Sequence, residues 1–143
     1  KLDPHAEVLA TLMTGHLEAG ASETEMTVRR RQLSDRSMLV LAGGAYARNS
    51  AGMRTRLLDL LPAVRASIDG PSVTAARMQV ALALARAAGD SGGLAEHIGW
   101  GFEATGNPFA AVAHYDALSA VTARSLTEYI DTLTGPLTAS VTR

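Results

Sequence analysis

The feature that most constrains the fold is a local change of hydrophobic period. From Thr24 to Leu33, apolar and polar residues alternate, which is typical of a β-strand with one solvent-facing side. A continuous apolar run follows from Met38 to Ala42 and ends at two glycines, which indicates a more deeply buried strand. Turn-forming residues separate the two segments, so we predict a β-hairpin near residues 24–45.

Most of the remaining chain has a helical pattern of apolar residues. One helix is predicted over 4–17, and a second over 52–68, where the apolar residues form a single stripe. Pro62 lies inside this stripe, and we expect it to kink the helix or to restart it. Breaks rich in Gly, Pro and Asp divide the following sequence into four more predicted helices, at 73–88, 94–102, 109–118 and 123–133.

Several residues mark the ends of these elements. The sequence Asp69-Gly70-Pro71-Ser72 ends one helix and begins the next, with Ser72 as the expected cap. Thr122 is the expected N-cap of the last helix. Beyond Gly135-Pro136, residues 137–142 alternate apolar with hydroxyl side chains, which predicts a terminal strand.

Strands near both ends of the chain, with helices between them, predict an α+β fold. In this fold, several helices cover an antiparallel sheet made of the hairpin near 24–45 and the terminal strand near 137–142. An all-α bundle is the alternative, because short apolar runs do not distinguish strand from helix by periodicity alone. The length of 143 residues suits one domain over 1–143.

Charge and composition argue against several classes of partner. The 13 basic and 14 acidic residues nearly cancel, so no broad electrostatic field favours nucleic acid. The longest apolar stretches are too short to cross a bilayer, so we expect no membrane partner. The chain has no cysteine, which removes disulfides and thiolate sites and leaves the compartment open. We favour the cytoplasm slightly, although a start at Lys1 is compatible with a cleaved upstream segment.

The sequence predicts no catalytic residue, no cofactor and no metal site. Its four histidines are His5, His16, His97 and His114. None of them has the close spacing of zinc ligands, so we expect polar residues on partly exposed helices. Paired carboxylates occur, but nothing desolvates one partner relative to the other, and surface charge is their expected role. The motifs of a serine nucleophile or a phosphate loop are absent.

Two groups of residues form a candidate partner surface. The run Arg29–Arg31 lies on a predicted strand, where neighbours point to opposite faces. A solvated edge strand explains it most simply, and contact with an acidic partner is the alternative. Four aromatic residues lie between 100 and 115, where glycines weaken a helix, so core packing competes with a partner-facing surface. The candidate residues are Arg29, Arg31, Trp100, Phe102, Phe109 and Tyr115.

The order of several sequence pieces resembles that of a known family. The pieces are the helix Pro4–Gly20, the strand Ser37–Tyr46, the stripe Met53–Ile68, and then Gly70-Pro71-Ser72, Gly92–Glu96, Gly106-Asn107-Pro108 and Ala120–Leu126. Together they resemble the non-catalytic, carboxyl-terminal half-unit of an insulinase-like (pitrilysin-type) zinc metallopeptidase. The resemblance covers nearly the whole chain, and its most literal part is the helix start Val121-Thr122-Ala123.

The resemblance implies a role without catalysis. The family's catalytic half carries His-x-x-Glu-His, in which two histidines bind zinc and the glutamate activates water, and this chain lacks that motif. The second half usually offers an Arg and a Tyr to the substrate, and residues 16–23 contain neither. Strands that precede the family's first helix are also absent, so we expect a fragment of a longer half-unit.

The partners implied by the resemblance are a zinc-bearing peptidase half or subunit and a peptide substrate that the two halves enclose. Self-association into a homo-oligomer stays open. A second hypothesis is the helical ligand-sensing or dimerisation domain of a transcription regulator, and a third is a small enzyme with an apolar pocket. Residues 24–42 distinguish the first two hypotheses, because a hairpin there favours the peptidase half-unit and a continuous helix favours the regulator.

Overall fold

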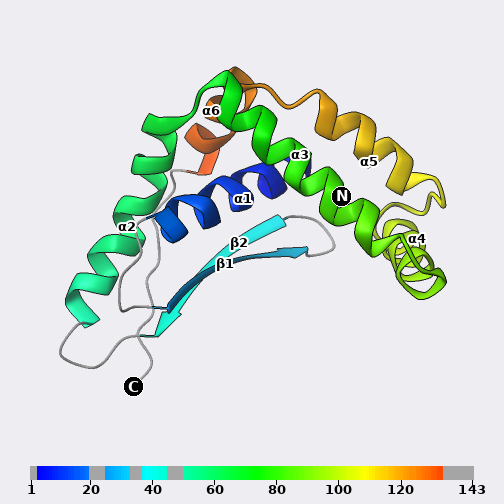
Figure 1. Cartoon of the computed structure of the whole chain (residues 1–143), viewed down its shortest axis with the longest axis horizontal. Helices are drawn as coiled ribbons and strands as arrows, with labels where there is room; N and C mark the ends of the chain where they lie inside the picture. The colour runs from blue at the N-terminus through cyan, green and yellow to red at the C-terminus, as the bar shows by residue number, and fades with distance from the viewer. Residues whose placement is uncertain (1–2, 20–24, 33–36, 45–49, 134–143) are drawn as a thin grey trace.

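A computed structural model describes residues 3–19, 25–32, 37–44 and 50–133 of the chain. The described part has an α+β fold dominated by helices, as predicted (Figure 1). Its elements, in chain order, are α1 (Pro4–Ala19), β1 (Glu25–Gln32), β2 (Ser37–Gly44), α2 (Ser50–Ser67), α3 (Gly70–Ala87), α4 (Ser91–Thr105), α5 (Ala110–Ser119) and α6 (Ala123–Leu133).

The predicted hairpin is confirmed. Strands β1 and β2 pair antiparallel, in a register that runs from Glu25 opposite Gly44 to Gln32 opposite Ser37. Leu39 and Leu41 are two residues apart and therefore share a face, and both pack with Val28 against the core. That face lies on α1 (Figure 1). The predicted terminal strand at 137–142 lies outside the described residues.

Helix α1 is the centre of the packing. It lies between the hairpin and the helices behind it, and it contacts α2, α3, α5 and α6 as well as both strands. Its residues Val8 and Leu9 are completely buried, and Met13 is nearly so. The main residues packed around them are Leu60, Leu61, Val64, Val73, Ala76, Val80, Leu118, Val121, Leu126 and Ile130.

Helix α2 continues through Pro62 as one helix, so the predicted restart does not occur. Proline lacks the backbone N–H that would donate to the preceding turn. The residues Leu61 and Val64 on either side are buried, however, whereas Pro62 itself is exposed. Tertiary packing of the apolar side therefore holds the helix despite the missing hydrogen bond.

The N-cap of α3 is Asp69, three residues before the predicted Ser72. Its carboxylate accepts a hydrogen bond from the Ser72 N–H at 2.7 Å, while the Asp69 N–H donates to the Ser72 hydroxyl at 3.0 Å. This reciprocal capping box lowers the pKa of Asp69, mainly through the backbone hydrogen bond from Ser72. At α6 the prediction is confirmed, because Thr122 and Ser125 form the same pair of hydrogen bonds at 3.1 and 3.0 Å.

Polar side-chain contacts join α2 to α6 and α3 to the end of α5. Arg65 of α2 donates from Nε to Asp131 Oδ1 of α6 at 2.8 Å and from Nη2 to Oδ2 at 3.1 Å. These side-chain hydrogen bonds lower the pKa of Asp131 below its ordinary value. Arg77 of α3 donates to the carbonyls of Ser119 and Val121, at the end of α5 where helix carbonyls lack intrahelical partners.

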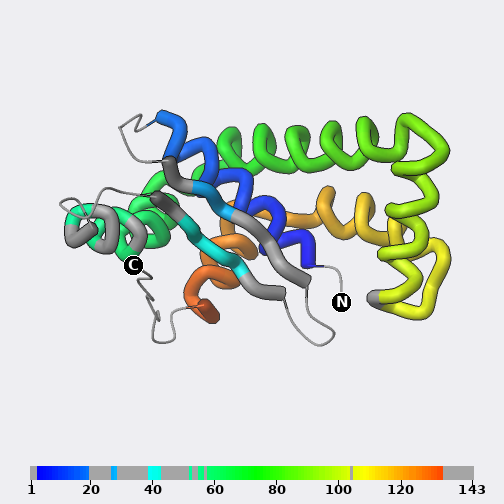
Figure 2. The backbone as a smooth tube through the Cα atoms, turned by 90° about the horizontal axis from the view of Figure 1, so that it is seen from below, coloured from blue at the N-terminus to red at the C-terminus, as the bar shows by residue number. Residues whose placement is uncertain are grey.

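Helices α4 and α5, which we call the arm (Ser91–Ser119), lie at one end of the molecule beyond the hairpin (Figures 1 and 2). Two glycines allow the close approach of α4 to its neighbours. A side chain at Gly93 would overlap the carbonyl of Ala87 in α3, and a Cβ at Gly101 would lie 3.3 Å from the Ala110 Cβ in α5. Glycine at these positions therefore sets how α4 packs.

Candidate functional site

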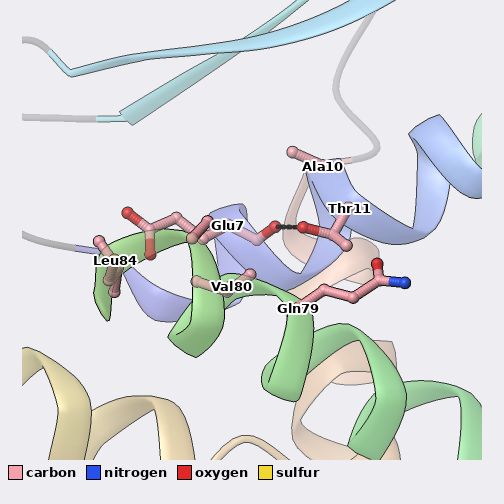
Figure 3. A pocket seen from close by; sticks show the side chains of 7 residues that line it. Glu7, Ala10, Thr11, Gln79, Val80 and Leu84 are labelled. Atoms are coloured by element: carbon pink, nitrogen blue, oxygen red, sulfur yellow. Dashed lines mark hydrogen bonds between the residues drawn. The ribbon is translucent and has the colours of Figure 1, made fainter. Parts of the chain in front are cut away.

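A cavity of about 480 Å³ lies between α1 and α3 and opens to solvent on one side (Figure 3). Its lining is mainly apolar and consists of Glu7, Ala10, Thr11, Gln79, Val80, Ala83 and Leu84. The Thr11 hydroxyl already donates to the Glu7 carbonyl at 3.0 Å. An apolar lining with few polar groups suits an apolar side chain of a ligand rather than a reacting polar group.

The carboxylate at the edge of this cavity is held by a histidine of α5. The distance from Glu7 Oε2 to His114 Nε2 is 2.6 Å, and His114 is only 2% exposed. With Glu7 ionised, the His114 Nε2–H donates to it, and Nδ1 has no hydrogen-bond partner among the described residues. The pair links α1 to α5 at the boundary of the core.

The expectation that the histidines lie on partly exposed helices is wrong for His114. Ala110, His114 and Leu118 follow one another at four-residue spacing and form the buried side of α5. His114 is therefore forced inward, and the carboxylate from α1 compensates for its burial. The spacing with Ala110 and Leu118 is a signal that the sequence already contained, whereas the partner Glu7 is 107 residues away.

A second histidine links the start of α1 to α6. His5 Nε2 lies 3.1 Å from the Ser125 hydroxyl, and the His5 ring stacks on Tyr129 at 5.4 Å between centroids. The Tyr129 hydroxyl donates to Asp3 at 2.9 Å. Within residues 3–19, 25–32, 37–44 and 50–133, no three His, Asp or Glu side chains are grouped so that they could hold a metal ion.

The structure separates the candidate partner residues into two regions. Phe102 and Phe109 are 54% and 71% exposed, in α4 and just before α5. Trp100 and Tyr115 of the arm are half-buried, and the Tyr115 hydroxyl donates to the Ala81 carbonyl of α3 at 3.3 Å. Trp100 and Tyr115 are therefore partly covered by the chain itself, whereas Phe102 and Phe109 present most of their side chains to solvent.

The two candidate arginines lie on the hairpin instead of the arm. Arg29 is paired with Val40 and Arg31 with Met38 along the β1–β2 ladder. The side chains of both arginines lie outside what the structure describes. The backbone of β1 lies against α1, whereas α4 contacts α3 and α5 (Figure 1).

Sequence reasoning missed two exposed apolar residues of α4. Leu94 and Ile98 are 45% and 39% exposed and precede Phe102 at four-residue spacing. The glycines around Trp100 had drawn attention to the aromatic residues alone. Both could have been found by searching α4 for apolar residues that recur three or four positions apart.

No family model, curated protein or solved structure matches this chain. No described helix is both long and apolar enough to pass through a bilayer. Function is therefore argued from the order of the elements and from the two surfaces described above, the α1–α3 cavity and the exposed side of α4.

Proposed function

We propose that the chain is a catalytically inactive insulinase-like metallopeptidase domain, which helps to enclose and position a peptide substrate for a zinc-bearing partner. The observation that carries this proposal is the hairpin at 25–44, packed on a preceding helix and followed by a run of helices. This is the order expected from the resemblance. The Thr122-capped helix after the run has the predicted capping hydrogen bonds as well.

The hairpin also bears on the second hypothesis. A continuous helix over residues 24–42 would favour a helical sensing or dimerisation domain of a transcription regulator. Residues 25–32 and 37–44 instead form paired strands. The hairpin therefore favours the peptidase-like half-unit over the regulator.

The chemistry of the cavity supports binding without catalysis. Glu7 is the carboxylate of this cavity, and it is hydrogen-bonded to the buried His114. A carboxylate held in this way orients α1 and α5, whereas a general base must reach the proton that it abstracts from a substrate. We infer that the cavity receives an apolar side chain of the peptide.

The proposal is tested by assaying cleavage of quenched-fluorescent peptides in the presence of zinc. We expect no chelator-sensitive cleavage by the chain alone. Addition of a His-x-x-Glu-His half-unit encoded in the same genome should produce cleavage that a chelator abolishes. Chelator-sensitive cleavage by the chain alone contradicts the proposal, and so does a mixture that is no more active than the added half-unit.

The role of the cavity is tested by a matched pair of variants in the same assay. Ala83 and Ala85 are both exposed on α3, but Ala83 lines the cavity and Ala85 does not. We expect Ala83→Arg to raise the KM of the mixture by roughly tenfold, since an arginine obstructs the cavity. Ala85→Arg should leave the KM unchanged. Equal effects of the two variants would show that the peptide does not use the cavity.

A further inference from the structure

Helix α3 carries apolar side chains on two opposite sides. Its inner side is buried in the core, with Val80 near the middle of the helix. Met78 and Leu82 are two positions before and after Val80, and two positions turn a helix by about 200°, so both side chains point away from the core. They are 68% and 50% exposed. Figure 2 shows α3 (green) along one edge of the described part of the chain, where its outer side is open to a partner.

The outer apolar residues of α3 form a line that we call the outer stripe. It consists of Ala75, Met78, Leu82 and Ala85, all of them exposed. Spacings of three, four and three residues keep these positions within about 80° of one another around the helix axis. The same alternation of three and four is the contact pattern of paired helices. Single exposed apolar residues are ordinary at a protein surface, whereas a line at this spacing indicates a surface that contacts another helix.

The order of side-chain sizes in the outer stripe is the same in both directions. Two large side chains, Met78 and Leu82, are flanked by two alanines, and the four positions are symmetric about residue 80. In an antiparallel second copy, Met78 therefore lies opposite Leu82 of the partner, and Ala75 lies opposite Ala85. The large side chains meet at the centre of the contact, and the small ones allow the helix axes to approach at both ends. This is the self-complementarity that a two-fold interface requires.

The charges beside the outer stripe permit a second copy to bind there. Helix α3 contains no acidic residue, and its two arginines are Arg77 and Arg86. Arg77 donates to the carbonyls of Ser119 and Val121, so it is directed toward the end of α5. In the antiparallel pair, the two Arg86 residues are about 18 Å apart along the helix axis, which exceeds the Debye length of about 10 Å at 0.1 M salt. The antiparallel direction also brings helix termini of opposite partial charge together.

We propose that the chain self-associates through the outer stripe into an antiparallel, two-fold symmetric dimer, in which Met78 of each protomer packs against Leu82 of its partner. Each protomer contributes one helix of 18 residues, so the contact is about 27 Å long and belongs to the small interfaces. We therefore expect a weak dimer, with a dissociation constant on the order of 10 µM.

This inference does not depend on the proposed function. The outer stripe and the α1–α3 cavity have no residue in common. Peptide cleavage is assayed at nanomolar concentrations of the chain, at which the expected dimer is dissociated. The failure of either proposal can therefore be recognised separately.

The test measures the dissociation constant by sedimentation velocity of the chain from about 1 to 500 µM, a range that brackets the expected value. Leu82→Lys places a lysine against Met78 of the partner at both contacts, and Met78→Glu places a glutamate against Leu82 of the partner. Each variant alone should weaken the dimer by roughly tenfold or more, because a charge loses water against an apolar side chain.

A mixture of these two variants tests the direction of the helices. In the antiparallel pair, the glutamate at position 78 of one protomer faces the lysine at position 82 of the other, and the remaining contact is an unmodified Leu82–Met78 pair. The mixture should therefore dimerise roughly tenfold more tightly than either variant alone. A parallel pair would place each introduced charge against an apolar side chain, so mixing would restore little.

Phe102→Glu is the matched control. Phe102 is 54% exposed on α4, against 50% for Leu82, so the substitution removes a similarly exposed apolar side chain outside the outer stripe. It should dimerise like the unmodified chain. Circular dichroism checks that all three variants remain folded.

Three results would overturn the proposal. The first is a chain that stays monomeric at the highest concentration, and the second is a mixture that dimerises no better than its two components. The third is a dimer that Phe102→Glu dissociates and Leu82→Lys does not, which would place the interface on α4.

Discussion

The contact between Glu7 and His114 is the most consequential polar contact between side chains at the edge of the core. The His114 side chain is almost fully buried beside Leu118, while that of Glu7 is 12% exposed and remains in limited contact with water. Without Glu7, the buried Nε2 of His114 would lose its hydrogen-bond partner, which costs more than the net gain of the pair. The pair therefore specifies how α5 lies on α1.

We expect His114→Ala to lower the free energy of unfolding by about 3 kcal/mol, because it removes buried volume and the hydrogen bond from the His114 ring to Glu7. His16→Ala, at an exposed position of α1, should change it by less than about 0.5 kcal/mol. Urea denaturation followed by circular dichroism measures both values. A Glu7→Ala, His114→Ala double variant as unstable as the sum of the single variants would show that the contact contributes nothing.

For the individual helices and strands, the periodicity of apolar residues predicted the structure better than capping residues predicted where helices begin. The hairpin followed from the alternation at residues 24–33, and Leu39 and Leu41 face the core as that period requires. The start of α3 was misplaced, because Asp69 and Ser72 are both good caps and only their mutual hydrogen bonds decide between them. The choice between a kink and a restart of α2 at Pro62 could not be made either, since it depends on the packing of Leu61 and Val64.

Helix α6 provides a test of capping in isolation from charge. The Thr122 hydroxyl accepts from the Ser125 N–H at 3.1 Å, between the buried residues Val121 and Leu126. Thr122→Ala should lower the free energy of unfolding by about 1 kcal/mol. Thr74→Ala, at an exposed position within α3, should be neutral or slightly stabilising because alanine has the higher helix propensity. Thermal unfolding compares the two variants, and equal loss at both positions would exclude capping as the cause.

At the scale of the whole molecule, the packing is unevenly distributed. Helix α1 contacts both strands and the helices α2, α3, α5 and α6, whereas α4 packs against α3 and α5. No described residue of α4 belongs to the buried core. The sequence could not show this difference, because α1 and α4 both carry apolar residues at helical spacing and only the tertiary arrangement decides which stripe is covered. The spacing of Leu94, Ile98 and Phe102 was visible in the sequence, but their exposure was not.

This arrangement predicts two levels of hydrogen-exchange protection. Amides of α1 should exchange only through global unfolding, and those of α4 through local opening of lower free energy.

Leu9→Ala, at a completely buried position, should reduce global stability by about 3 kcal/mol and accelerate α1 exchange by roughly a hundredfold. Exchange in α4 should stay the same, because local opening of α4 alone leaves the contacts of Leu9 intact. Leu82→Ala, at a half-exposed position of α3, is the control and should alter neither rate greatly. Acceleration of α4 exchange in step with α1 would instead show that α4 unfolds only together with the core.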